Sequence, residues 1–358
     1  MVLKLIGIGC LALAGACASA LQYEIIDLGT LGGAFSVAFG INDIGQVVGR
    51  AEGAGGSVHA FLYSGGAMID LGTLGGATSE ARGINGSGQV VGWSATADGS
   101  GRAFLYSGGT MQDLGTLGTG ISYANAINNS GQVVGGATTA GGSVHAFMYS
   151  GGAMIDLGTL GGNTSEAYGI NDMGQVVGRA EGAGGSVHAF LYSGGAMIDL
   201  GTLGGVTSEA LGINGSGQVV GWSATADGYS RAFLYAGGAM IDLGTLGGHE
   251  SAAFGVNALG QVVGASDLTN GSRHAFLYAG GLMQDLNSLL APNSSDWLLA
   301  AAYGINSSGW IVGLGYNAYS QEHAFLAKPL GNPPAPEPAV TLPMVLGLGA
   351  AILRRRKK

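Results

Sequence analysis

The sequence has few of the side chains that support covalent or redox chemistry. Its 358 residues include 2 cysteines, Cys10 and Cys17, and both lie within the first twenty positions. If this segment is removed, as its pattern predicts below, no thiol remains for a disulfide, a zinc–thiolate site or a nucleophile. Charged residues are also scarce, at 10% of the chain, which excludes disorder caused by an excess of charge.

Basic residues are rarest in the middle of the chain. Of the 13 Lys and Arg residues, Lys4 and the five from Arg354 to Lys358 lie at the two ends, whereas nearly all of the 22 acids lie between them. The long middle region is therefore more negative than the net charge of −9 for the whole chain. Such a surface repels phosphate backbones and anionic lipid, so nucleic acid is not an expected partner.

The first twenty residues have the pattern of a cleaved secretory signal peptide. Lys4 precedes an apolar run over residues 5–16, and Ala18 and Ala20 supply the small side chains that a signal peptidase accepts. Residues 1–20 are therefore predicted to be removed. The alternative is a lipoprotein acylated at Cys17, in which the residue three positions earlier is alanine rather than the preferred leucine.

The other end of the chain has three short segments. Residues 331–338 form a proline-rich linker, residues 339–353 are apolar apart from one threonine and one proline, and residues 354–358 are all basic. A spanning helix needs roughly 20 apolar residues, so the second segment predicts a short hydrophobic helix that is marginal as a permanent anchor. The basic tail is expected to stay in the cytoplasm, with the preceding chain outside the inner membrane.

This tail resembles a PEP-CTERM sorting signal, because Pro336, Glu337 and Pro338 precede a short apolar stretch and a terminal arginine cluster. The resemblance implies a Gram-negative bacterium and recognition by exosortase-type sorting machinery. It also implies an inner-membrane-anchored precursor that loses its tail and reaches the cell surface or the extracellular space together with exopolysaccharide. The alternative is a plain C-terminal anchor.

Between the two ends the chain consists of seven copies of one unit. Each unit contains a GIN-like triplet, a GQVVG-like string and an HAF-like triplet, and the body resembles HAF-type bacterial extracellular repeats. That family name describes a repeat and carries no established activity. An aspartate that opens a DLGTLGG-like string recurs every 43 residues, at Asp27, Asp70, Asp113, Asp156, Asp199, Asp242 and Asp285.

Each unit predicts four short strands separated by turn residues. In the second unit they cover residues 79–85, 89–93, 102–106 and 111–114. An Asn-x-x-Gly sequence between the first two strands, and a Gly-Gly pair between the last two in the first six units, favour tight hairpins. Both faces of the last hairpin are mostly apolar, so the sheets are expected to stack between neighbours. Units of this length with four strands are typical of β-propeller blades.

The ends of the array distinguish a closed ring from an open solenoid. The chain enters with a fourth strand, residues 25–28, and leaves after a third strand, residues 323–326, so one unit is split between the termini. This split is expected if the N-terminal strand completes the last blade, which also removes exposed sheet edges. The sequence therefore predicts an all-β, seven-bladed propeller over residues 21–330, closed by its N-terminal strand. The alternative is a β-solenoid.

The first position of the HAF triplet is histidine in five units and arginine in two. Arginine can replace histidine as a hydrogen-bond donor but not as a neutral metal ligand or a general base, so a structural role is predicted. One aspartate per unit also falls short of the six to eight oxygens that calcium needs, and no metal or cofactor is predicted. The predicted pairs across the hairpins are His59 with Asp70, Arg102 with Asp113, His145 with Asp156, His188 with Asp199, Arg231 with Asp242, and His274 with Asp285.

The copies differ in the loops between their second and third strands, and the last copy has six extra residues before its first strand. These loops are expected on one face of a propeller. Aromatic rings beside amide and acid groups suit stacking on a sugar ring. The candidate ligand face consists of Asn293, Asp296, Trp297, Tyr316 and Tyr319, and the alternative for the tryptophan is packing inside the closure.

No catalytic apparatus is identifiable in the sequence. The predicted function is an exported cell-surface or secreted protein that binds or scaffolds, associated with exopolysaccharide or a biofilm matrix as the sorting tail implies. One alternative is a propeller-type polysaccharide hydrolase or lyase, which needs two acids that converge from non-equivalent loops. Another is an adhesive array without a small ligand. The acids available to the enzymatic alternative are Asp98, Asp227, Asp267, Asp296 and Glu322.

Overall fold

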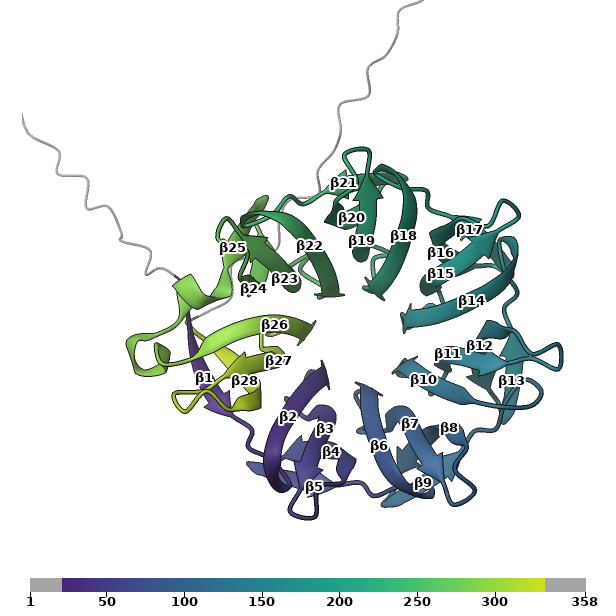
Figure 1. Cartoon of the computed structure of the whole chain (residues 1–358), viewed down its shortest axis with the longest axis horizontal. Coiled ribbons are helices and arrows are strands. Elements are labelled where there is room, and N and C mark those ends of the chain that lie inside the picture. Colours follow the sequence, from purple (N-terminus) through teal and green to yellow (C-terminus); the bar gives the residue numbers. More distant parts are fainter. Residues whose placement is uncertain (1–20, 332–358) are drawn as a thin grey trace, which may run out of the picture.

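The computed structural model describes residues 21–331, and seven four-stranded antiparallel sheets surround a central axis (Figure 1). The predicted seven-bladed β-propeller is thereby confirmed, and the solenoid alternative is wrong. Within residues 21–331 no helix is long and apolar enough to cross a membrane. The predicted signal peptide, the sorting motif, the C-terminal hydrophobic helix and the basic tail lie outside the described residues.

Within each blade the four strands are arranged in order from the central axis to the outside. The innermost strands are β2 (Gly32–Ile41), β6 (Gly75–Ile84), β10 (Ser122–Ile127), β14 (Gly161–Ile170), β18 (Gly204–Ile213), β22 (Gly247–Val256) and β26 (Leu298–Ile305). The second strands are β3 (Val47–Gly53), β7 (Val90–Thr96), β11 (Val133–Thr138), β15 (Val176–Gly182), β19 (Val219–Thr225), β23 (Val262–Leu268) and β27 (Ile311–Tyr316). We number the blades 1 to 7 in this order.

The outer half of each blade is a second hairpin, except at the closure. The third strands are β4 (Val58–Ser64), β8 (Gly101–Ser107), β12 (Val144–Ser150), β16 (Val187–Ser193), β20 (Ser230–Ala236), β24 (Arg273–Ala279) and β28 (Glu322–Leu330). The outermost strands are β5 (Ala67–Asp70), β9 (Thr110–Asp113), β13 (Ala153–Asp156), β17 (Ala196–Asp199), β21 (Ala239–Asp242), β25 (Leu282–Asp285) and, in blade 7, β1 (Gln22–Asp27).

Glycines set both the turns and the spacing of the strands. Gly65 and Gly66, which connect β4 to β5, have φ values of 61° and 87°, a left-handed conformation that suits a two-residue hairpin loop. Gly92 of the GQVVG string is required for a different reason. A Cβ atom there would lie 1.9 Å from the main-chain oxygen of Glu80, so no other residue fits between β7 and β6.

The hydrophobic core lies between adjacent blades rather than inside any one of them. One cluster, for example, joins Val48 and Ala60 of blade 1 to Ala81, Val90 and Phe104 of blade 2. Truncating a phenylalanine in such a site to alanine costs about 3–5 kcal/mol. The phenylalanine of every HAF triplet is fully buried: Phe61, Phe104, Phe147, Phe190, Phe233, Phe276 and Phe325.

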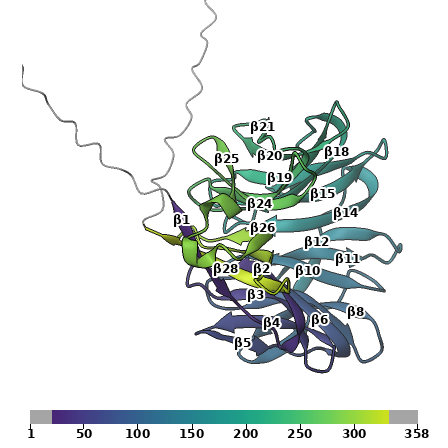
Figure 2. The same cartoon turned by 60° about the vertical axis from the view of Figure 1, so that its left-hand side comes forward.

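The N-terminal strand closes the ring, as the sequence predicts. β1 pairs with β28 in an antiparallel register from Gln22 opposite Leu330 to Asp27 opposite Phe325. Tyr23 and Leu28 are buried, at 1% and 4% exposure. Figure 2 shows the two strands side by side, although they come from opposite ends of the propeller sequence.

The extra residues of the last copy cover the outer edge of β1. The lengthened crossing from β25 to β26 contains two short 3₁₀ helices, η1 (Leu286–Leu289) and η2 (Pro292–Ser294). The Ala291 N–H donates to the Tyr23 oxygen at 2.8 Å, and the Ile25 N–H donates to Ser294 Oγ at 3.0 Å. An edge strand presents unpaired N–H and C=O groups that promote aggregation. The insertion supplies hydrogen-bond partners for two of these groups on β1.

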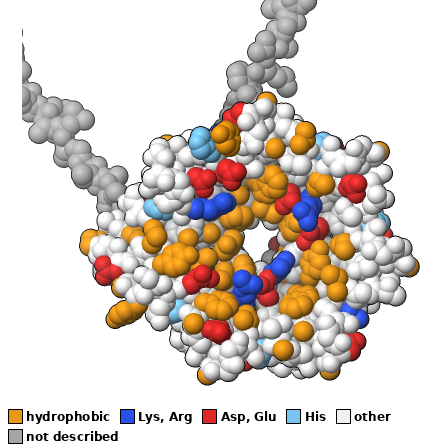
Figure 3. All heavy atoms as spheres, in the orientation of Figure 1, with side chains coloured by type: hydrophobic (Ala, Val, Ile, Leu, Met, Phe, Trp, Pro, Cys, Tyr) orange, Lys and Arg blue, Asp and Glu red, His pale blue; other side chains and the backbone are white. Residues whose placement is uncertain are grey.

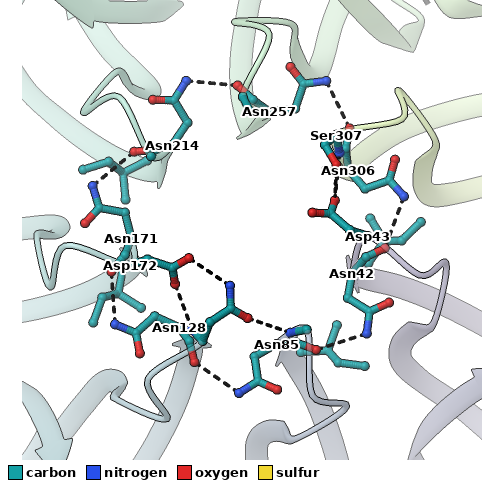
Figure 4. Close-up of a pocket in the computed structure, with 18 of the residues that line it drawn as sticks. Asn42, Asp43, Asn85, Asn128, Asn171, Asp172, Asn214, Asn257, Asn306 and Ser307 are labelled. Atoms are coloured by element: carbon teal, nitrogen blue, oxygen red, sulfur yellow. Dashed lines mark hydrogen bonds between the residues drawn. The ribbon is translucent and has the colours of Figure 1, made fainter. Parts of the chain in front are cut away.

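Seven asparagines form a continuous hydrogen-bonded ring around one mouth of the central channel (Figure 4). In each blade the asparagine side chain donates to the main-chain oxygen of the equivalent asparagine in the next blade. The bond from Asn85 to Asn128 measures 3.1 Å, and the bond from Asn306 to Asn42, which completes the ring, measures 3.2 Å. All seven side chains are buried. The GIN triplet is therefore an inter-blade connector as well as a turn signal.

Deletion of residues 21–28 should open the ring. The change removes the partner of β28 and exposes the cluster around Tyr23, so we expect an aggregating product with a lower melting temperature. Size-exclusion chromatography and thermal unfolding measure both effects. Gln22→Ala, at an exposed position of the same strand, should leave both unchanged. A monomeric deletion variant with an undiminished melting temperature would contradict the closure.

Candidate functional site

The central channel is lined by structural groups at the asparagine-ring mouth. The cavity there has a volume of about 260 Å³ and includes two acids, Asp43 and Asp172. Asp43 accepts a hydrogen bond from Ser307 Oγ at 2.6 Å, and Asp172 accepts one from Asn129 Nδ2 at 2.8 Å. Both acids are thus used to join neighbouring blades. Among residues 21–331 no group of three or more His, Cys, Asp or Glu side chains could hold a metal ion.

A groove of about 520 Å³ crosses blades 1 to 3 near the face where the loops between second and third strands emerge. Its walls come from strands rather than from loops. Figure 3 shows this face, where basic, acidic and hydrophobic side chains lie side by side around the channel opening. The side chains that define its chemistry are Phe35 of β2, Arg50 of β3, Glu80 and Arg82 of β6, Trp93 of β7 and Tyr123 of β10.

Glu80 holds the two arginines of the groove in fixed positions. Its carboxylate accepts from Arg50 Nη1 at 2.9 Å and from Arg82 Nε at 2.7 Å. The Glu80 side chain is 13% exposed, whereas those of Arg50 and Arg82 are 42% and 40% exposed. Arg82 Nη1 also donates to Asn125 Oδ1 at 2.7 Å. A guanidinium carries five N–H donors, so both arginines retain donors for a ligand while the buried acid fixes their orientation.

Aromatic rings form the apolar part of the same groove. Trp93 is half-buried and lies against Gly101, where a Cβ atom would come within 2.2 Å of the indole Nε1. Burial raises the pKa of the Tyr123 hydroxyl, and the negative charge of Glu166 raises it further. Tyr123 therefore stays neutral at physiological pH and can both donate and accept a hydrogen bond.

The groove exists because the copies differ at these strand positions. The position of Arg50 is occupied by Trp93 in blade 2 and by Gly136 in blade 3, and the position of Tyr123 is occupied by Glu80 in blade 2. The loops alone do not reveal this pattern. An alignment of the seven copies by strand position would have found it.

The predicted ligand face is not gathered into this groove. Trp297 is half-buried and packs against the cluster around Tyr23 and Leu299, which was the alternative for this residue. Asn293 lies in η2, with its Nδ2 3.4 Å from Glu24 Oε1, and Asp296 is exposed. Tyr316 and Tyr319 are 37% and 85% exposed. A ligand contact at these two tyrosines stays a prediction.

The histidine and aspartate side chains pair across the outer hairpins. Nδ1 of each histidine lies 2.8 Å from the aspartate in His59–Asp70, His145–Asp156, His188–Asp199 and His274–Asp285. A pair that was not predicted, His323 with Asp27, has the same distance and crosses the ring closure. Each exposed pair of this kind is worth about 0.2–1 kcal/mol.

The two arginine pairs differ from the histidine pairs. Arg102 Nε lies 3.8 Å from Asp113, and Arg102 Nη1 donates to the Gly120 oxygen. The predicted pair of Arg231 with Asp242 is wrong. Arg231 Nη2 lies instead 3.9 Å from Asp227, because the long side chain reaches back over the Tyr229 ring to the acid of its own hairpin loop.

Two acids of the enzymatic alternative, Asp98 and Asp227, are each held by hydrogen bonds within their own loop. Asp98 accepts hydrogen bonds from Thr96 Oγ1 and from the Ser100 N–H, and these bonds lower its pKa to about 2. The hydrogen bond from Thr225 lowers the pKa of Asp227 in the same way. Both carboxylates are ionised at neutral pH and are unsuited to donate a proton to a leaving group.

No protein-family model matches the chain, and no curated protein matches it. Solved structures do resemble it. A puromycin-hydrolysing peptidase from Mycobacterium tuberculosis has a TM-score of 0.52 and 11% identity, over 80% of this chain and 51% of that chain. TolB from Acinetobacter baumannii has a TM-score of 0.46 and 11% identity, over 83% and 65%. The six-bladed β-propeller lectin of Aleuria aurantia, with its fucose recognition mode, has a TM-score of 0.40 and 13% identity, over 89% and 98%. The chain thus spans less than two thirds of the peptidase and of TolB, and at these identities the likeness shows the β-propeller fold alone.

Substitution of the paired aspartates by asparagine tests whether the short histidine pairs stabilise the fold more than the longer arginine pair does. Asp156 and Asp113 each accept a 2.8 Å hydrogen bond from a glycine N–H two residues later, which asparagine preserves. Asp156→Asn also weakens the bond to His145, so its melting temperature should fall by the equivalent of up to about 1 kcal/mol. Asp113→Asn should lower the melting temperature less, because Arg102 Nε lies 3.8 Å from Asp113. Equal melting temperatures for wild type and both variants would contradict a structural role for the pair.

Proposed function

We propose that this chain is an exported, non-enzymatic carbohydrate-binding propeller whose ligand lies in the groove across blades 1 to 3. The observation that carries the proposal is the combination of Trp93 and Tyr123 with two arginines anchored on Glu80. A sugar ring presents C–H groups on its faces and hydroxyl groups at its edge. Aromatic rings bind the first kind of surface, and oriented N–H donors bind the second.

The cellular setting of the proposal rests on the two ends of the sequence. The signal-peptide pattern of residues 1–20 supports export, and the tail with Pro336, Glu337 and Pro338 resembles a PEP-CTERM signal. We propose on this basis that exosortase-type machinery processes the tail, after transient anchoring in the inner membrane, and that the propeller is released to the cell surface or the exopolysaccharide matrix.

The protein's own charge narrows the ligand class. The region between the ends carries most of the 22 acids and few of the 13 bases, so long-range forces oppose the approach of polyanions. Within the groove, Glu80 offsets one of the two arginine charges. A neutral sugar fits this balance better than a phosphate or sulfate group.

Trp93→Ala should weaken glycan binding about tenfold, because it removes the stacking surface of the groove. A glycan array of the purified protein identifies the ligand, and calorimetry then gives the affinity. Trp222→Ala is the matched control, since Trp222 holds the same position three blades later and lies outside the groove. Equal affinity losses in the two variants would contradict the site, and an array without any signal would favour the adhesive repeat without a small ligand.

A further inference from the structure

A second cavity adjoins the groove on the side of blade 4. It has a volume of about 350 Å³ and lies between blades 3 and 4. Thr164, Glu166, Arg179 and Glu181 of blade 4 line it, together with Tyr123 of blade 3. Tyr123 therefore contributes to both cavities.

A glycine explains the position of the Tyr123 ring, which lines both cavities. Trp93 of blade 2 and Arg179 of blade 4 hold equivalent strand positions, and the equivalent residue of blade 3 is Gly136. A Cβ atom at Gly136 would come within 2.6 Å of the Tyr123 hydroxyl oxygen. The Tyr123 ring therefore lies over the bare backbone of β11. The ring thus covers the position at which blades 2 and 4 carry the large side chains of Trp93 and Arg179.

The second cavity has the same kind of polar side chains as the groove across blades 1 to 3. Arg179 Nη1 lies 2.7 Å from Glu209, and Arg179 Nη2 lies 3.0 Å from Glu166. The Tyr168 hydroxyl also donates to Glu166 at 2.9 Å. The arginine side chain remains 43% exposed, whereas both glutamates are mostly buried. Each cavity is thus lined by an arginine that a mostly buried glutamate holds in place.

We infer that the two cavities form one continuous groove, from Phe35 in blade 1 to Glu181 in blade 4, that takes a linear, uncharged oligosaccharide of several sugar units with Tyr123 beneath its middle. This inference rests on the proposed function and extends it from a single sugar to a chain. Neutrality follows from the charges, because the arginines are nearly balanced by acids. The charged side chains are Arg50, Arg82 and Arg179 against Glu80, Glu166, Glu181 and Glu209.

The experiment measures affinity against ligand length with the full chain. The probes are uncharged oligosaccharides of two to about eight units, cello- and malto-series first and then the series of any neutral glycan found on the array. Affinity should rise with length until the chain reaches blade 4 and then level off. Matched oligomers that contain uronic acids should bind more weakly.

A matched pair of variants locates the far end of the groove. Glu181 and Glu52 lie in identical Arg-Ala-Glu-Gly sequences, and each accepts an N–H from the first strand of its own blade. Of the two cavities, only the second one includes either glutamate. Glu181→Ala should weaken the longest oligomers about fivefold and leave the disaccharide unchanged. Glu52→Ala should change neither.

The outcomes separate the inference from the proposed function. A protein that binds no glycan overturns the proposed function and the inference together. Affinity that is independent of length beyond the disaccharide, equal effects of the two glutamate variants, or a preference for uronic acids overturns the extended neutral groove alone. Binding of a peptide library in the groove, competing with no sugar, would assign it to a different class of ligand and overturn both.

Discussion

Closure of the ring by β1 and β28 is the interaction on which the rest of the structure depends. Every core cluster lies between two sheets, so each blade needs a neighbour on both sides. Around blade 7 the cluster of Leu28 and Leu326 with Phe61 of blade 1 forms only if β1 is in place. The asparagine ring obeys the same condition, because a gap leaves one buried donor and one acceptor unpaired at about 1–3 kcal/mol each.

The residues that hold the ring together are the same in nearly every copy, and the residues that line the groove are not. The phenylalanine of the HAF triplet, the asparagine of the GIN triplet and a serine between blades recur around the axis. Ser79 Oγ, for example, accepts from the Ala60 N–H of the preceding blade at 2.8 Å. Arg50, Trp93 and Gly136 share one position and have three different chemistries. A symmetric scaffold thereby carries a site that is present on one side only.

The repeat spacing and the split unit were sufficient to predict the ring, because strand period and turn glycines are local signals. The groove was missed because it depends on how adjacent sheets approach each other. Arg50 and Glu80 are thirty residues apart and belong to different blades, and nothing in either strand alone shows that they meet. The insertion was misleading for a related reason. Its tryptophan suggested a ligand, whereas Tyr23 and Ile25 need backbone partners at the free edge of β1. Arg231 failed as a predicted pair because a long flexible side chain has more than one acid within reach.

Hydrogen exchange at the closure tests the central claim most directly. The Leu28 N–H donates to the Ala324 oxygen at 3.0 Å, and the Leu71 N–H makes the equivalent bond to Ala60 in blade 1. If the N-terminal strand is an integral part of the ring, both amides should exchange through the same cooperative opening, with equal protection. Exchange of the Leu28 amide at the rate of an unprotected loop, while Leu71 stays protected, would show that the ring stands without its N-terminal strand and would contradict the account.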